Sequence, residues 1–207
     1  MEPLATMAAS ESGVRRANAY HALAKALIPP SVWPSGLVGA MGDAFAPFGG
    51  PLAGIGLRVV EQATAGLENP EELAAAHAQL FIGPFEIAAA PWASFYLDPD
   101  QRLMGAASEY AAKSYAAVGL GPQVGPCDAP DHVTHELEFM YFLAFQGSTT
   151  GDPIWHARQA SFWTGHLGLW LPDLARSMAR AGTHPFYQAL AEALIEFCLL
   201  EDALLNS

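Results

Sequence analysis

The sequence is rich in alanine and leucine and poor in β-branched residues, and its apolar positions recur with helical spacing along nearly the whole chain. In the first predicted helix, residues 10–27, the apolar stripe includes Val14, Tyr20 and Leu27. Proline and glycine interrupt this pattern at intervals. The pattern therefore predicts an all-α fold, a compact multi-helix bundle.

Prolines, glycines and capping residues set the predicted helix boundaries. Asn69 is expected to cap a helix with Pro70 at its first position, and Pro172 to kink a later helix or start a new turn. Prolines exclude regular helix from residues 84–100, which are expected to form an extended aromatic-rich loop. The predicted helices cover residues 10–27, 35–45, 52–65, 70–83, 103–118, 131–145, 153–170 with continuation to 180, and a last helix opened by His184 and Pro185. Residues 147–151 are expected to be a polar break.

One domain is expected for the whole chain, residues 1–207, because 207 residues with 52% hydrophobic content can bury a sizeable core. We expect two helical halves, at about 10–118 and 131–205, joined by a glycine- and proline-rich connector at about 119–130. Such a connector permits a domain-swapped dimer as well as a monomer.

The charge balance is strongly acidic: 9 Lys and Arg against 21 Asp and Glu give a net charge of −12. Nucleic-acid binding needs phosphate-neutralising cations, so this composition argues against it and favours a basic partner such as an arginine-containing peptide. The two cysteines, Cys127 and Cys198, are far apart, which excludes a disulfide framework and a cysteine-rich zinc site.

No membrane-spanning or secretory segment is expected. The longest weakly charged stretch, residues 28–57, contains five prolines, and the N-terminus lacks a basic region followed by an apolar run. Arg15 and Arg16 form a twin-arginine pair, but the residues after them do not suit an export signal. We therefore expect this pair on the polar face of a helix, and a cytoplasmic protein without stable membrane insertion.

A dense polar cluster lies between residues 128 and 138. His132, His135 and Glu136 are spaced to share one helical face and could hold a metal, which would make the chain a small metal-dependent enzyme. The alternative is a helix start at which Asp128 or Asp131 is the cap. No third ligand segment, nucleophile motif or phosphate-binding loop accompanies the cluster, so neither catalysis nor a cofactor is expected.

Aromatic side chains on the predicted loop suit a peptide ligand. Trp92, Phe95 and Tyr96 lie among prolines, and an exposed aromatic beside acids fits an amphipathic peptide whose basic end precedes an apolar end. Arginine favours planar carboxylate partners, which Asp128, Asp131 and Glu136 can supply.

Three segments, in order, carry a resemblance to a known family. The first is Leu-Phe-Ile-Gly-Pro-Phe at 80–85 with Pro-Trp-Ala-Ser-Phe-Tyr-Leu-Asp at 91–98 and Leu-Met-Gly at 103–105. The second is Pro-Asp-His at 130–132 with residues 136–140, and the third is His166, Trp170 and Pro172 with His-Pro-Phe-Tyr-Gln-Ala-Leu at 184–190. Over residues 77–195 the chain resembles the TorD/DmsD/NarJ family of molybdoenzyme-maturation chaperones, its DmsD-like branch. Ala93 and Met104 stand where that family commonly has Gly and Phe.

The resemblance implies an all-helical fold of the TorD/DmsD type, a cytoplasmic location and no catalysis. It implies a chaperone that binds the twin-arginine leader, with or without the mature part, of a molybdopterin-containing oxidoreductase subunit until the cofactor is inserted and the Tat pathway exports it. Whether nucleotide or molybdenum cofactor binds stays open. The candidate peptide-binding residues, from the resemblance and from the chemistry above, are Leu80, Phe81, Pro84, Pro91, Trp92, Ser94, Tyr96, Asp128, Asp131, His132 and Glu136. The competing interpretation is a helical interaction module with a partner outside the Tat pathway.

Overall fold

The computed structural model describes residues 4–83, 87–121 and 129–206, with the backbone alone for residues 4–10. The α-helices are α1 (Leu4–Ala26), α2 (Leu37–Phe45), α3 (Gly50–Glu68), α4 (Pro70–Phe81), α5 (Ser94–Leu97), α6 (Ala106–Ala116), α7 (Val133–Thr150), α8 (Pro153–Phe162), α9 (Gly168–Ala181) and α10 (Pro185–Leu205). Short 3-10 turns lie at Pro30–Val32 and Ala46–Phe48, and a π turn at Trp163–Leu167 joins α8 to α9. Across these described ranges no β-strand forms, and the all-α prediction is confirmed.

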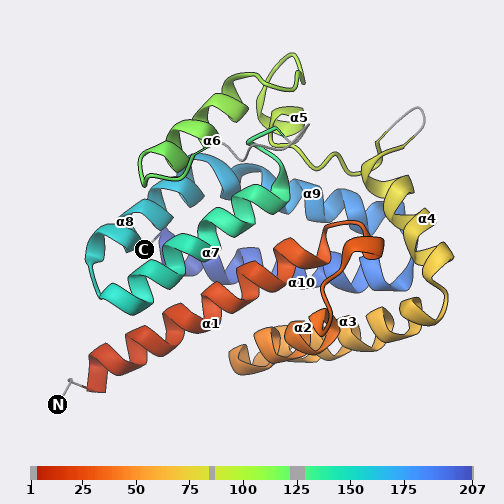
Figure 1. Ribbon diagram of the computed structural model, residues 1–207, viewed down its shortest axis with the longest axis horizontal. Helices are drawn as coiled ribbons and strands as arrows, with labels where there is room; N and C mark the ends of the chain where they lie inside the picture. The colour runs from red at the N-terminus through yellow and green to blue at the C-terminus, as the bar shows by residue number, and fades with distance from the viewer. Residues whose placement is uncertain (1–3, 84–86, 122–128, 207) are drawn as a thin grey trace.

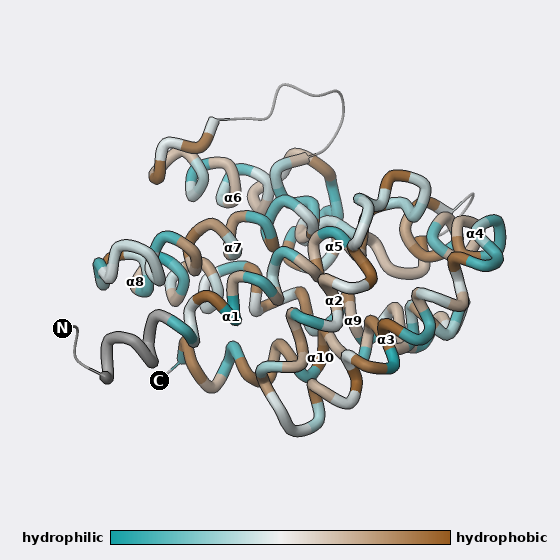
Figure 2. The backbone as a smooth tube through the Cα atoms, turned by 60° about the horizontal axis from the view of Figure 1, so that its bottom comes forward, coloured by the Kyte–Doolittle hydropathy of each residue, from teal (hydrophilic) through white to brown (hydrophobic). Residues whose placement is uncertain are grey.

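The helices pack around one apolar core. α1 runs along α7, α10 packs against α3 and α9, and α2 lies between α1 and α3 (Figure 1). Apolar and polar residues alternate along each helix (Figure 2), and the buried apolar ones include Tyr20, Trp163, Trp170 and Phe197. Helices from both sides of the predicted 119–130 connector therefore share this core.

The prediction for the twin-arginine pair on α1 is half correct. Arg15 is exposed and pairs with Glu11, as expected on a polar face. Arg16 instead is buried and holds the Glu201 carboxylate of α10 through Nε at 2.6 Å and Nη2 at 2.5 Å. The Tyr20 hydroxyl donates to the same carboxylate at 2.6 Å. Arg16 therefore links α1 to α10 through a buried ion pair. Local periodicity cannot reveal this pair, because Glu201 lies at the other end of the chain.

Two segments predicted as irregular are partly helical. α5 forms inside the 84–100 loop, because residues 94–97 contain no proline. α7 continues through the predicted 147–151 break to Thr150, where the hydroxyls of Ser148 and Thr149 donate to the carbonyl of Phe145 at 2.8 and 2.9 Å. The helix ends at Gly151, whose φ of +67° is a left-handed conformation.

The caps of α4 and α10 differ in chemistry. Asn69 does occupy the N-cap position of α4, but its side chain donates to Glu72 at 2.6 Å and makes no cap bond. His184 caps α10, because its Nδ1 accepts the N–H of Phe186 at 3.1 Å. Pro172 lies inside α9, so it neither ends the helix nor starts a new element.

Candidate peptide-binding site

The Pro91–Ser94 segment meets the start of α7, which joins two of the segments that the sequence singled out. Trp92 and His132 form an isolated antiparallel bridge. The N–H of Ala93 donates to the carbonyl of Asp131 at 3.0 Å, and the N–H of Val133 donates to the carbonyl of Pro91 at 2.8 Å. Main-chain hydrogen bonds therefore fix the position of Trp92 relative to His132.

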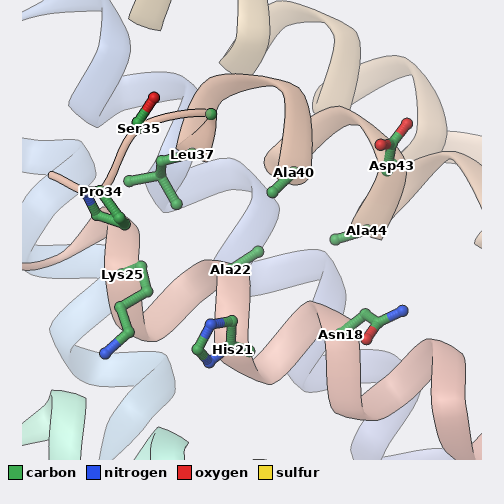
Figure 3. Close-up of a pocket in the computed structure, with 11 residues that line it drawn as sticks. Asn18, His21, Ala22, Lys25, Pro34, Ser35, Leu37, Ala40, Asp43 and Ala44 are labelled. Carbon is green, nitrogen blue, oxygen red and sulfur yellow. The ribbon is translucent and has the colours of Figure 1, made fainter.

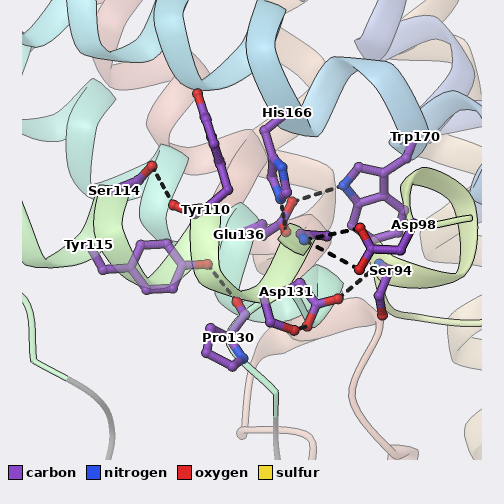
Figure 4. A network of polar contacts seen from close by, with 12 residues as sticks. Ser94, Asp98, Tyr110, Ser114, Tyr115, Pro130, Asp131, Glu136, His166 and Trp170 are labelled. Carbon is purple, nitrogen blue, oxygen red and sulfur yellow. Dashed lines mark hydrogen bonds and ion pairs between the residues drawn. The ribbon is translucent and has the colours of Figure 1, made fainter. Parts of the chain in front are cut away.

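Asp131 stabilises this junction from inside the protein. Its side chain is fully buried, one carboxylate oxygen accepts the N–H of Ser94 at 2.9 Å, and the other accepts the hydroxyl of Ser108 from α6 (Figure 4). The expectation that Asp131 caps α7 is therefore wrong. The cap is His132, whose Nδ1 accepts the N–H of Thr134 at 3.3 Å.

Glu136 points into the core from the first turn of α7. Its carboxyl group is fully buried between His166, whose Nε2 lies 2.7 Å from Oε1, and Trp170, whose Nε1–H donates to Oε2 at 3.0 Å (Figure 4). Burial raises the pKa of Glu136 to about 7, even though His166 and Trp170 favour the charged form. Asp131 and Glu136 thus already have internal partners.

His166 lies on the π turn, where it contacts α6. The ring of Tyr110 stacks on the His166 ring with centroids 4.8 Å apart. A side chain at Gly165 would place its Cβ 2.8 Å from the Tyr110 hydroxyl, so the Tyr110 ring would have to shift. π turns occur mainly as single turns inside helices and often at functional sites. Here the turn brings His166 to Glu136, directly behind the junction.

The start of α6 depends on two residues of the sequence motif. Asp98 accepts the N–H of Ala107 at 3.2 Å, which caps the helix. A Cβ at Gly105 would lie 2.3 Å from the Asp98 carboxylate, so a larger residue there would displace Asp98 from this position. The cap in turn places Ser108 against Asp131. Ser108 is not among the residues that the sequence singles out, because a serine in an alanine-rich helix carries no distinguishing pattern.

The aromatic candidates take different positions. Trp92 is half-buried, and its ring lies 5.8 Å from that of Phe95 and 5.6 Å from that of His132. Tyr96 stacks on Trp170 at 5.4 Å, and burial raises its pKa to about 12. Trp92 is thus the aromatic candidate at the junction itself, whereas Tyr96 packs toward α9.

The Leu80–Phe81 candidates lie in the core. Both side chains are buried, and the Phe81 ring contacts those of His77 at 4.9 Å and Tyr187 at 5.9 Å. The carbonyl of Leu80 accepts the N–H of Ala89 at 2.9 Å, which ties the loop back onto α4. Pro84 and Asp128 lie outside the described residues.

The metal hypothesis finds no support in the part of the chain that is described. There, no group of three or more His, Cys, Asp or Glu side chains could hold a metal ion. His132 and His135 are neighbours, with ring centroids 5.8 Å apart, but Glu136 is bonded to His166 and Trp170 instead.

A separate cleft of about 430 Å³ opens between α1 and α2 (Figure 3). Ala22 and Ala40 lie in it together with His21, Lys25 and Asp43. None of the predicted peptide-binding residues lines this cleft.

Comparison with known proteins identifies the family. The model of the nitrate reductase delta subunit family matches residues 51–176, more than half of the chain. Two curated relatives are the chaperone protein TorD of Vibrio parahaemolyticus serotype O3:K6 (strain RIMD 2210633) and the Tat proofreading chaperone DmsD of Salmonella typhi. Each is 28% identical, over 65% of this chain and 64% of TorD, and over 60% of this chain and 57% of DmsD. The chain therefore spans less than two thirds of the length of these relatives.

A solved structure supports the fold. A redox enzyme maturation protein from Archaeoglobus fulgidus superposes with a TM-score of 0.55 and 20% identity, over 87% of this chain and 92% of that one. The likeness extends to the all-helical architecture. The chain belongs to the nitrate reductase delta subunit family, the TorD/DmsD/NarJ family that its motifs resemble. No helix in the described ranges is long and apolar enough to span a membrane.

Proposed function

We propose that this protein is a non-catalytic, cytoplasmic maturation chaperone. It binds the twin-arginine leader of a molybdopterin-containing oxidoreductase subunit. It holds the leader until the cofactor has been inserted, after which the Tat pathway exports the subunit. The relative DmsD is named as a Tat proofreading chaperone. The observation that carries the proposal is the junction at which two family segments meet, the bridge between Trp92 and His132.

The candidate residues divide between contact and support. Trp92 and His132 are half-buried, so part of each residue is accessible to a peptide. Asp131 and Glu136 are fully buried and bonded within the chain, so their role in the proposal is to hold the junction in shape. Pro91 and Ser94 belong to the contact segment, and Leu80, Phe81 and Tyr96 support the site from the interior. Pro84 and Asp128 stay predictions from sequence.

The acidic surface suits a basic leader. A net charge of −12 attracts a peptide that carries two guanidinium groups, and this attraction speeds association and weakens with salt. Overall charge does not distinguish arginine from lysine, whereas hydrogen bonds to a planar guanidinium do. Comparing the arginine leader with its lysine counterpart therefore separates nonspecific charge attraction from specific recognition of the guanidinium groups.

Calorimetric titration with a twin-arginine leader peptide and its Lys-Lys counterpart tests the proposal. We expect micromolar or tighter binding of the arginine form, weakened about tenfold, or about 1.4 kcal/mol, in the lysine form. Trp92→Ala should weaken binding while the protein stays folded. Trp155→Ala, at a half-buried tryptophan that packs against Phe142 on α7, is a control for loss of an aromatic side chain elsewhere.

Two results would count against this function. Equal affinity for the arginine and lysine forms would mean that the site recognises only the apolar segment of the leader. Absence of binding to leaders from several molybdoenzymes would favour the interaction module with a partner outside the Tat pathway.

A further inference from the structure

Two buried polar atoms at the junction have no hydrogen-bond partner within the described part of the chain. They are Nε1 of Trp92 and the hydroxyl oxygen of Ser94. Among the described residues only five side chains contain such an atom, and these two are separated by a single residue. Buried polar groups in native proteins are nearly always bonded, so a pair of exceptions in one short segment needs an explanation.

The surroundings do not lack hydrogen-bonding capacity. Asp131 lies beside Ser94 but accepts its main-chain N–H and the hydroxyl of Ser108, and leaves the Ser94 hydroxyl without a partner. Three other tryptophan side chains do find acceptors. Nε1 of Trp33 donates to the carbonyl of Ile28 at 3.1 Å, and Trp163 and Trp170 donate to carboxylates. The missing partners are therefore local to the Pro91–Ser94 segment.

The chemistry of the two groups restricts what can satisfy them. An indole N–H is a donor only, and a serine hydroxyl can donate as well as accept. Guanidinium and ammonium groups have no acceptor, so the arginines of a leader cannot satisfy Trp92. A peptide carbonyl oxygen can accept from both. It is also present at every residue of a bound peptide, whatever its side chains.

We infer that Nε1–H of Trp92 and the hydroxyl of Ser94 donate hydrogen bonds to main-chain carbonyl oxygens of the bound leader. The inference rests on the proposed function and adds the kind of contact that this segment makes. Both donors are covered in the free protein, so leader binding includes a small opening of the Pro91–Ser94 segment. The unsatisfied donors favour that opening, because their hydrogen bonds form only in the complex.

Isosteric variants separate this role from a structural one. Trp92→Phe keeps an aromatic ring and removes Nε1–H, and Ser94→Ala removes only the hydroxyl. Each should weaken leader binding about tenfold, while the melting temperature of the free protein stays unchanged or rises. That combination is expected only of a donor that has no partner until the peptide binds.

Matched controls come from bonded groups of the same kind. Trp33→Phe removes an indole N–H that is bonded to Ile28, so it should lower the melting temperature and leave leader affinity unchanged. Ser108→Ala removes a buried hydroxyl that is bonded to Asp131, so it should lower the melting temperature where Ser94→Ala does not.

A leader peptide with single main-chain amides replaced by esters identifies the acceptor, because an ester carbonyl accepts a hydrogen bond more weakly. At one position the ester should weaken binding to the wild type and have little further effect on Trp92→Phe. Three results would overturn the inference. The first is wild-type affinity in both Trp92→Phe and Ser94→Ala, and the second is a lower melting temperature in both. The third is the same ester effect in wild type and variant at every position. If the wild type binds no leader at all, the proposed function itself fails.

Discussion

Replacing Glu136 by glutamine should stabilise the protein at alkaline pH and have little effect in acid. The pKa of about 7 means that the folded protein keeps this carboxyl protonated up to near-neutral pH, whereas the unfolded chain releases the proton near 4.5. The folded state therefore binds more protons between these values, and this group's contribution to stability falls as pH rises through that window. Each pKa unit corresponds to about 1.4 kcal/mol, so the loss reaches about 3 kcal/mol by pH 8.

Glutamine reproduces the protonated acid at this position. Its carbonyl can accept the N–H of Trp170, and its amide can donate to Nε2 of His166, the two contacts that Glu136 makes. The variant cannot lose a proton, so it avoids the cost of a buried charge. We expect a stability gain of about 3 kcal/mol at pH 8, shrinking to about 1 kcal/mol or less at pH 5.

Urea denaturation of both proteins between pH 5 and 8 measures the difference in stability, in which the titration of groups that do not contact Glu136 cancels. Glu192→Gln, at the exposed ion pair with Arg58, is the control and should change stability by at most about 1 kcal/mol. A glutamine variant that is less stable than wild type at every pH would refute the reasoning. Glu136 would then be ionised in the folded protein.

Two further substitutions test how the fold supports the site. Gly105→Ala should cost at least about 1–2 kcal/mol in denaturation experiments, because the new Cβ would lie 2.3 Å from the Asp98 carboxylate that caps α6. Arg16→Met should cost about 3–5 kcal/mol, because it leaves Glu201 buried without its charged partner, whereas the exposed Arg15→Met should change stability by no more than about 0.5 kcal/mol. Equal costs for the two arginines would contradict the burial of Arg16.

The helices could be predicted from sequence because their signals are local. Alanine- and leucine-rich periodicity, with Pro70 and Pro185 at the first helical positions, locates α4 and α10 without tertiary information. α7 was predicted too short, because a glycine and three hydroxyl residues resemble a break. Its hydroxyls instead bond to carbonyls one turn back, at Phe145 and Gln146, and the helix continues.

The site could be predicted only as a set of segments. The Pro-Trp and Asp-His motifs do meet, but sequence could not assign the inward-facing roles of their acids. The partners of Asp131 and Glu136 come from α5, α6, the π turn and α9, and the partner of Arg16 comes from α10. Such pairings depend on how distant helices pack, which helical periodicity does not encode.

Burial of Asp131 changes which variant best tests leader binding. An Asp131→Asn protein replaces one carboxylate oxygen by an amide that can only donate, so the hydrogen bond with the Ser108 hydroxyl has to reverse or the one from the Ser94 N–H is lost, and both lose the charged acceptor. Reduced leader affinity in that variant would mix damage to the junction with loss of any contact to the peptide. Trp92 and Ser94 avoid this ambiguity, because Nε1 and the hydroxyl have no partner to lose in the free protein. A change in affinity without a loss of stability can therefore be assigned to the peptide at these two positions and not at Asp131.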